Sequence, residues 1–232
     1  MTTTNLPART GPSDALRQNP VVAVLRAPHA TDYAPVIEAL LAGGIRCIEL
    51  TLSTPGVFTE LTGLQTRFGS EADLGIGTIT TLAQAQQAID GGAGFIVTPV
   101  TDPEIIRLCT ARGVPVYPGG LTPTELHAGW SAGATAVKIF PASTVGPGYI
   151  SQLRGPFPDI QVMPSGGIDI ADVPGWIRAG AVAVSLGGPL LQKAFKGGSL
   201  TDLTIRARTV TGLVTDALAA ANPRQQTAGG RA

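Results

Sequence analysis

A repeating unit is the feature that most constrains the fold of this chain: a short apolar segment, a polar or glycine-rich end, a helical segment and a glycine. Short apolar runs bounded by turn residues are typical of strands buried on both faces of a parallel sheet. Eight such runs predict strands, at residues 21–26, 45–52, 73–79, 95–100, 114–120, about 134–141, 160–168 and 181–188.

Helices are predicted between most of these strands. They cover residues 31–41, a segment that starts near 81, and residues 102–111, 122–131, 172–179 and 200–221, with a further short helix at 12–18. Strands that alternate with helices predict an α/β fold, and we expect a single (β/α)8 TIM barrel with a short N-terminal helix. A dinucleotide-binding sheet would need a G-x-G-x-x-G turn after an early strand, and Arg26 is not followed by one.

One domain is the expected organisation for 232 residues. Residues 1–19 are predicted to form a leader and a short helix, residues 20–221 the barrel, and residues 222–232, which contain proline and two glycines, a disordered tail.

Composition excludes several classes of function. The chain has 16 basic and 16 acidic residues, so it lacks the charge excess that nucleic acids or anionic membranes attract. No apolar run approaches the roughly 20 residues that span a bilayer, and no signal-peptide segment begins the chain, so we expect a cytoplasmic protein. The two histidines exclude a histidine-rich metal site, and Cys47 and Cys109, which lie in apolar runs, are expected to be free thiols.

Lys138 lies inside an apolar, β-prone segment. Alternate side chains of a strand share a face, so Ala136, Lys138 and Phe140 should point one way and Val137 and Ile139 the other. Burial of an amine lowers its pKa and leaves more of the free base, which can attack a carbonyl carbon and form a Schiff base. The alternative is that Lys138 caps the barrel floor in an ion pair with a carboxylate.

Other polar side chains are expected to converge on the lysine, because active sites of these barrels lie at the carboxyl ends of the strands. The inward-facing polar residues there are Arg26, Glu49, Thr51, Thr78, Lys138 and Ser165. Glu49 is predicted to move protons for the lysine, although a simple buried ion pair would also place it there.

Arg26 suits the two-point binding of a carboxylate, and Thr78 could bond the same group, or merely satisfy a turn. Pro99 and Phe140 are expected to form an apolar wall. The pairs Gly166-Gly167 and Gly187-Gly188 follow strands seven and eight, where such barrels often bind phosphate through backbone N–H groups.

The chain resembles the class I aldolases of the 2-keto-3-deoxy-6-phosphogluconate (KDPG) family over about residues 20–220. This family also includes the phosphogalactonate and 4-hydroxy-2-oxoglutarate (KHG) enzymes. The segments that carry the resemblance are 23–26 (AVLR), 43–51, 75–78 (GIGT), 96–99 (IVTP), 118–119, 122–126 (TPTEL), 137–141 (VKIFP) and 164–168 (PSGGI).

The resemblance implies that Lys138 forms the Schiff base, that Glu49 is the acid and base, and that Arg26 and Thr78 hold the carboxylate of pyruvate. It also implies a homotrimer that needs no metal or other cofactor. Two positions depart from the family: Ser53 stands where many members have an arginine, and Gly188-Pro189 replaces a Gly-Ser pair whose hydroxyl contacts phosphate.

We therefore expect an aldolase that reversibly cleaves KDPG to pyruvate and glyceraldehyde 3-phosphate. The alternatives are a pyruvate aldolase for 4-hydroxy-2-oxoglutarate, for the phosphogalactonate epimer or for an unphosphorylated 2-keto-3-deoxy acid, which Pro189 would allow. A further alternative is a barrel that binds sugar phosphates without catalysis. No nucleic acid or membrane partner is expected, only a small 2-keto acid.

Overall fold

A computed structural model describes residues 9–221 of the chain. Its strand segments are β1 (Val21–Leu25), β2 (Cys47–Thr51), β3 (Asp73–Gly77), β4 (Ile96–Val97), β5 (Val116–Tyr117), β6 (Gly119–Gly120), β7 (Val137–Ile139), β8 (Val162–Pro164) and β9 (Val184–Leu186). The α-helices are α1 (Asp14–Gln18), α2 (Tyr33–Ala42), α3 (Val57–Phe68), α4 (Leu82–Asp90), α5 (Pro103–Ala111), α6 (Pro123–Ser131), α7 (Tyr149–Arg154), α8 (Val173–Arg178), α9 (Gly188–Leu191) and α10 (Leu200–Ala221). Short 3₁₀ helices are η1 (Ala30–Asp32), η2 (Ala142–Thr144), η3 (Ile170–Asp172) and η4 (Ala194–Lys196).

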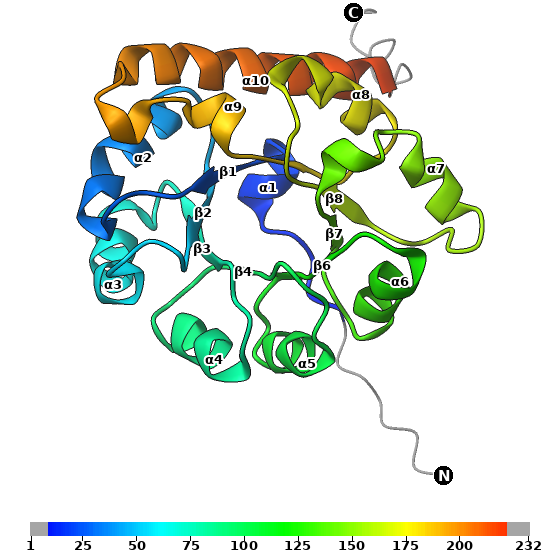
Figure 1. The fold of residues 1–232 in the computed structure, drawn as a ribbon. Coiled ribbons are helices and arrows are strands. Elements are labelled where there is room, and N and C mark those ends of the chain that lie inside the picture. Colours follow the sequence, from blue (N-terminus) through cyan, green and yellow to red (C-terminus); the bar gives the residue numbers. More distant parts are fainter. Residues whose placement is uncertain (1–8, 222–232) are drawn as a thin grey trace, which may run out of the picture.

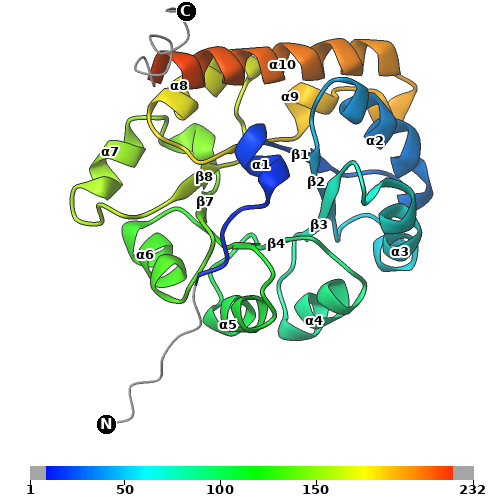
Figure 2. The same ribbon diagram turned by 180° about the vertical axis from the view of Figure 1, so that it is seen from behind.

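The strands form two parallel sheets. One has six strands in the order β5-β4-β3-β2-β1-β9 and the other has three in the order β6-β7-β8. The helices form the outer layer around the curled strands, except α1, which lies over one end of their interior (Figures 1 and 2). The predicted α/β fold with a parallel sheet is confirmed, but the strands are divided between two sheets rather than joined in one continuous eight-stranded sheet.

The two sheets meet at two junctions, one between β5 and β6 and one between β8 and β9. Only Pro118, which has no N–H to donate, separates β5 from β6, and its carbonyl still accepts a hydrogen bond from Lys138 N at 2.7 Å. Across the other gap, a parallel bridge pairs Ser165 with Ser185, and Val182 N donates to Val162 O at 2.9 Å. The second link connects the segment before β9 with β8, so the two sheets contact each other at both junctions.

The strands bury both faces, as the continuous apolar runs predict. The inner cluster contains Leu16 of α1 together with strand side chains of alternating register: Val22, Cys47, Phe95, Val97, Tyr117, Ala136, Met163 and Ala183. The outer cluster, between strands and helices, includes Val137 and Ile139. Ala136 therefore faces the interior, whereas Val137 and Ile139 face the helices, as the alternation predicts. Helix α1 closes one end of the interior.

Side-chain caps begin several of the predicted helices, whereas α2 and α8 start without one. Thr81 and Gln84 form a capping box at α4, and Thr122 and Glu125 form another at α6. No pattern in the sequence predicted α3 or α7. The first starts at Gly56 in a left-handed conformation without a side-chain cap, and the second lies between glycine- and proline-rich loops, so neither has a strong start signal.

The short helix predicted at 12–18 is present as α1, and the predicted closing helix is α10. The leader before residue 9 and the predicted tail at 222–232 lie outside the described residues. Within residues 9–221, no helix is both long enough and apolar enough to cross a membrane.

Candidate active site

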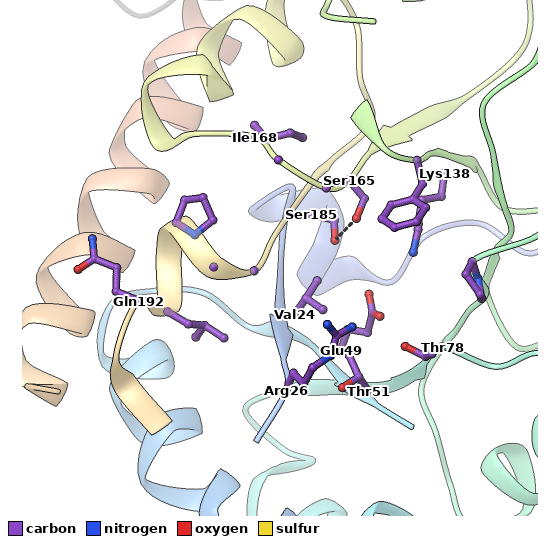
Figure 3. A pocket seen from close by; sticks show the side chains of 18 of the residues that line it. Val24, Arg26, Glu49, Thr51, Thr78, Lys138, Ser165, Ile168, Ser185 and Gln192 are labelled. Atoms are coloured by element: carbon purple, nitrogen blue, oxygen red, sulfur yellow. Dashed lines mark hydrogen bonds between the residues drawn. The ribbon is translucent and has the colours of Figure 1, made fainter. Parts of the chain in front are cut away.

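A cavity of about 480 Å³ opens at the carboxyl ends of the strands, and Figure 3 shows the side chains that line it. Every residue that the sequence analysis selected for the site lies on its wall. These residues are Arg26, Glu49, Thr51, Thr78, Pro99, Lys138, Phe140, Ser165, Gly166, Gly167, Gly187 and Gly188. They come from at least six strands or strand ends, so the fold gathers groups that are far apart in the sequence.

Lys138 lies in the middle of β7, paired with Gly119 on one side and Met163 on the other, and its side chain is 6% exposed. Its Nζ lies 4.8 Å from the centroid of the Phe140 ring. Burial lowers the pKa of Lys138 below its usual value, the nearby Glu49 opposes this shift, and Arg26 adds to it. The site therefore increases the fraction of neutral amine available for attack on a carbonyl carbon.

Glu49 lies in the middle of β2 and points toward the same cavity (Figure 3). Burial raises the pKa of this carboxyl group, against the opposing effects of Lys138 and Arg26. Its Oε2 has no hydrogen-bond partner, and within residues 9–221 no ion pair joins Glu49 to Lys138. The structure thus lacks the closed ion pair that was the alternative role for these two residues.

Glu49 owes its position to Gly77 at the end of β3. A Cβ atom at Gly77 would lie 1.8 Å from Glu49 Oε1, far inside contact distance. Only glycine leaves room for the carboxylate there. The sequence analysis included Gly77 in a family motif but did not identify this close approach, which no strand pattern signals.

Arg26 follows β1, and Ser53 orients it. Its Nε donates a hydrogen bond to Ser53 Oγ at 3.0 Å, and Ser53 Oγ lies 3.1 Å from Thr51 Oγ1. Thr51 in turn donates to Leu25 O at 2.9 Å. No carboxylate of the described residues pairs with Arg26. The guanidinium group therefore remains available for an anionic ligand, and Ser53, noted in the sequence only as a departure, fixes its direction.

Thr78 adopts a positive φ of 64°, a conformation that is rare for a β-branched residue. Such strain is typical of functional sites, where the surrounding structure holds the residue in place. Across the cavity, Gly166 and Gly167 have φ values of 87° and 71°, and a Cβ at Gly166 would lie 2.9 Å from the Phe140 ring. Backbone geometry therefore shapes both walls.

The sequence analysis did not assign eight of the lining residues to the site. These are Val24, Ile168, Ser185, Pro189, Leu191, Gln192, Phe195 and Lys196. Ser185 had a usable signal, a polar residue within an apolar strand, as at Lys138. The segment from Leu191 to Lys196 had none, because no periodic pattern placed it over the strand ends.

The described residues contain no group of three or more His, Cys, Asp or Glu side chains that could hold a metal ion. Cys47 and Cys109 are buried and free, as predicted. Burial raises the pKa of each thiol to about 12, so neither is activated as a nucleophile. The groups suited to chemistry in this cavity are an amine, a carboxyl group and a guanidinium group, which together suit reactions of keto acids.

Parallel strands that carry a buried lysine into a cavity with an unpartnered carboxyl group define a class of protein able to form imines with carbonyl compounds. Comparison with known proteins identifies the family. The family described as "Aldolase: KDPG and KHG aldolase" matches residues 13–204. The chain therefore belongs to the KDPG and KHG aldolase family.

Individual relatives agree with this assignment. The chain is 30% identical over 189 residues to the "Probable 2-dehydro-3-deoxy-6-phosphogalactonate aldolase" of Rhizobium meliloti, a match that covers 81% of this chain and 89% of the relative. It is 34% identical over 158 residues to the "2-dehydro-3-deoxy-phosphogluconate aldolase" of Treponema pallidum, covering 68% and 75%.

A solved structure is also similar. The KDPG aldolase of Legionella pneumophila, "with pyruvate captured at low pH as a covalent carbinolamine intermediate", superposes with a TM-score of 0.78 at 28% identity, covering 84% of this chain and 96% of that one.

Proposed function

We propose that this chain is a class I aldolase that reversibly cleaves KDPG to pyruvate and glyceraldehyde 3-phosphate. The observation that carries the proposal is the arrangement of Lys138 and Glu49: both are buried, both line one cavity, and they do not form an ion pair with each other. Burial shifts the pKa of the amine down and that of the carboxyl group up, which brings the two pKa values closer together and eases proton transfer. The carbinolamine of pyruvate in the Legionella relative supports the same chemistry.

Substrate binding begins at the carboxylate. Arg26, oriented by Ser53, binds the carboxylate of the 2-keto acid, with Thr51 and Thr78 beside it. This places the ketone carbon, C2, within reach of Lys138. Pro99 and Phe140 form the wall against the amine and limit access of water to it.

The chemical steps then follow from the two buried groups. The neutral amine of Lys138 adds to C2, and loss of water from the carbinolamine gives a protonated imine. Glu49 removes the proton of the C4 hydroxyl, the C3–C4 bond breaks, its electron pair moves toward the imine nitrogen as an enamine, and the aldehyde leaves. Glu49 returns the proton to C3, and water hydrolyses the imine to free pyruvate and Lys138.

The distal end of the substrate lies toward the glycine pairs. These glycines line the cavity, and in this proposal their backbone N–H groups hold the phosphate. Pro189 lies on the same wall and supplies neither an N–H nor a hydroxyl group. This observation favours the second candidate, an aldolase for unphosphorylated or differently substituted 2-keto acids.

Substrate comparison tests both candidates. The rate of pyruvate release would be measured for KDPG, its phosphogalactonate epimer, the unphosphorylated acid and 4-hydroxy-2-oxoglutarate. We expect the highest kcat/KM for KDPG; a preference for the unphosphorylated acid would select the second candidate. Pro189→Ser, which restores a hydroxyl and an N–H, should improve KM for phosphorylated substrates only. Release of no pyruvate from any of the four would favour a non-catalytic sugar-phosphate binding barrel.

The architecture and assembly are part of the proposal. We infer that β5 and β6 are two parts of one strand, so that the two sheets close into an eight-stranded barrel that forms one domain over residues 20–221. The links across Pro118 and between Ser165 and Ser185 support this closure. A homotrimer in the cytoplasm is proposed from the family resemblance, and sedimentation equilibrium of the purified chain tests the trimer.

A further inference from the structure

Ser185 is a buried hydroxyl on the cavity wall that the mechanism above does not use. It lies in the middle of β9, between Val184 and Leu186, and its side chain is 1% exposed. Its neighbours along the strand belong to the outer apolar core. Ser185 itself lines the cavity that contains Lys138 and Glu49. A hydroxyl placed here loses contact with bulk water and needs a hydrogen-bond partner.

The hydrogen bonds of Ser185 are incomplete. A serine hydroxyl has one proton to donate and two lone pairs that accept. Ser165 Oγ donates to Ser185 Oγ at 3.3 Å, so Ser185 acts as the acceptor in that pair. No other hydrogen bond of Ser185 Oγ is present within residues 9–221, and its proton therefore has no protein acceptor there. Because the group faces the cavity, a bound ligand can supply the acceptor.

Ser165 fixes the direction in which Ser185 can donate. The two residues pair as a parallel bridge between the end of β8 and β9, so the main chain holds both of their Cα atoms. Ser165 is itself 6% exposed. In Figure 3 the two serines face each other across the gap between these strands, at the wall of the cavity toward which Lys138 and Glu49 also point.

The serine pair lies along the path of the substrate. One end of the cavity has Arg26 and Thr78, and the other has Gln192 (Figure 3). A 2-keto acid held at Arg26 and bound to Lys138 must extend past Ser185 to reach the distal end. Glu49 serves the hydroxyl on the carbon of the cleaved bond, so the next oxygen along the chain is the hydroxyl one carbon further.

We propose that Ser185, oriented by Ser165, donates a hydrogen bond to the hydroxyl group on the carbon next to the aldehyde carbon. Ser185 is thus a specificity-determining residue that selects 2-hydroxyaldehydes as the aldehyde partner of pyruvate. The proposal rests on the aldolase function proposed above. It adds a preference for a hydroxyl group that contacts neither Lys138 nor Glu49 in the proposed mechanism.

The test is carbon–carbon bond formation between pyruvate and a matched pair of aldehydes, 2-hydroxypropanal and propanal, which differ only in that hydroxyl. Product keto acids would be separated and quantified. We expect the wild type to use 2-hydroxypropanal with the higher kcat/KM. Loss of one neutral hydrogen bond is worth about 1 kcal/mol, so Ser185→Ala should reduce this preference roughly fivefold, by lowering kcat/KM for the hydroxylated aldehyde.

Matched variants separate this role from a structural one. Ser185→Cys keeps the shape of the side chain, slightly enlarged, but donates weakly, so it should lose most of the preference as well. Ser165→Ala should weaken the preference less, because Ser185 keeps its proton. Thr110→Val removes a buried hydroxyl that bonds only Ile106 O, outside the cavity, and should leave the preference unchanged.

The outcomes are distinct. A wild type without preference, or a Ser185→Ala variant that loses activity equally with both aldehydes, would overturn the proposal for Ser185. If the wild type also fails to form a covalent adduct with pyruvate, the aldolase function has failed and not only this inference. Adduct formation together with an unchanged preference in Ser185→Ala would reject the inference alone.

Discussion

The two ends of the interior both contain buried titratable residues, yet they differ in what those residues can do. At the end closed by α1, Cys47 and Tyr117 pack among apolar side chains, and the half-buried Asp73 lies beside Cys47. At the other end, Lys138 and Glu49 line a cavity. Leu16 of α1 lies in the same cluster as Cys47 and is itself 2% exposed, so it covers Cys47, whereas Asp73 lines a separate cavity beside α1.

Strand β2 makes the comparison direct, since Cys47 and Glu49 lie two residues apart on one face. Burial raises the pKa of both. Cys47 lies within hydrogen-bonding reach of Ser13 and Asp73, whereas Glu49 has an oxygen with no partner among the described residues. Burial alone therefore does not identify a functional residue; a shifted pKa together with an unpartnered atom that faces a cavity marks a candidate.

Of these two positions on β2, Glu49 should affect turnover far more than Cys47. Glu49→Gln keeps the shape of the side chain but removes the proton-transfer group, and we expect kcat to fall roughly 10²- to 10⁴-fold. Cys47→Ala, on the same face of the same strand, should lower stability and leave kcat within about twofold, because no substrate reaches it. Steady-state kinetics and thermal unfolding of both variants make the comparison. Equal losses of kcat would show that the two ends are not functionally different.

Two glycines of β3, Gly75 and Gly77, allow the same comparison between the closed end and the open end. A Cβ at Gly77 would meet Glu49 Oε1 at 1.8 Å, and one at Gly75 would meet the Phe95 ring at 2.4 Å. Gly77→Ala should displace the carboxyl group and reduce kcat by about tenfold or more. Gly75→Ala should destabilise the closed end by roughly 1–3 kcal/mol through overpacking, with kcat of the folded fraction retained. Denaturant unfolding and turnover of each variant test this, and an inverted pattern would contradict it.

The pH dependence of imine formation reports directly on the open end. Only the neutral amine attacks, and burial lowers the pKa of Lys138, so the rate of adduct formation with pyruvate should rise with pH through a midpoint below 10.5. Glu49 raises this pKa, so Glu49→Gln should move the midpoint to lower pH. Trapping with cyanoborohydride over a series of pH values measures both. A midpoint at or above 10.5 would refute the effect of burial.

The smallest expected effect is that of Lys138→Met on the free energy of unfolding, and the direction of its change with pH can be worked out. Lys138→Met removes a buried charge, and we expect the free energy of unfolding to increase by about 1 kcal/mol at neutral pH. The folded pKa of Lys138 is lowered, so the unfolded state binds more protons between that pKa and 10.5. Wild-type stability therefore gains relative to the variant as pH rises through this interval. Urea titrations at several pH values should show that the difference in free energy of unfolding between Lys138→Met and the wild type becomes smaller as the pH rises. A difference that becomes larger would contradict the lowered pKa of Lys138.

The sequence predicted those features of the molecule that depend on the alternation of side chains along a strand and on the position of a residue at a strand end. Alternation along β2 and β7 placed Glu49 and Lys138 inward, and the carboxyl-end rule brought Arg26 and Ser165 to the same cavity. These inferences need only local spacing and one general property of parallel strands, so they do not require knowledge of packing.

What the sequence missed depends on contacts between distant segments. The clearance between Gly77 and Glu49, the hydrogen bond from Arg26 to Ser53, and the wall from Leu191 to Lys196 arise only when strands and loops are assembled. The positive φ of Thr78 is likewise imposed by its surroundings rather than by its residue type. Ser185 differs, because the sequence shows it as a polar residue within an apolar strand. Its hydrogen bond to Ser165, which only the structure shows, is what suggests a role in substrate binding.

The most direct test of the central claim is the intact mass of the protein after incubation with pyruvate and borohydride. If Lys138 is the amine that attacks the ketone, wild-type protein gains the mass of one reduced pyruvyl group, peptide mapping places it on Lys138, and Lys138→Met gains nothing. No gain in folded wild-type protein, or an equal gain in Lys138→Met, would contradict the assignment of Lys138 as the Schiff-base lysine.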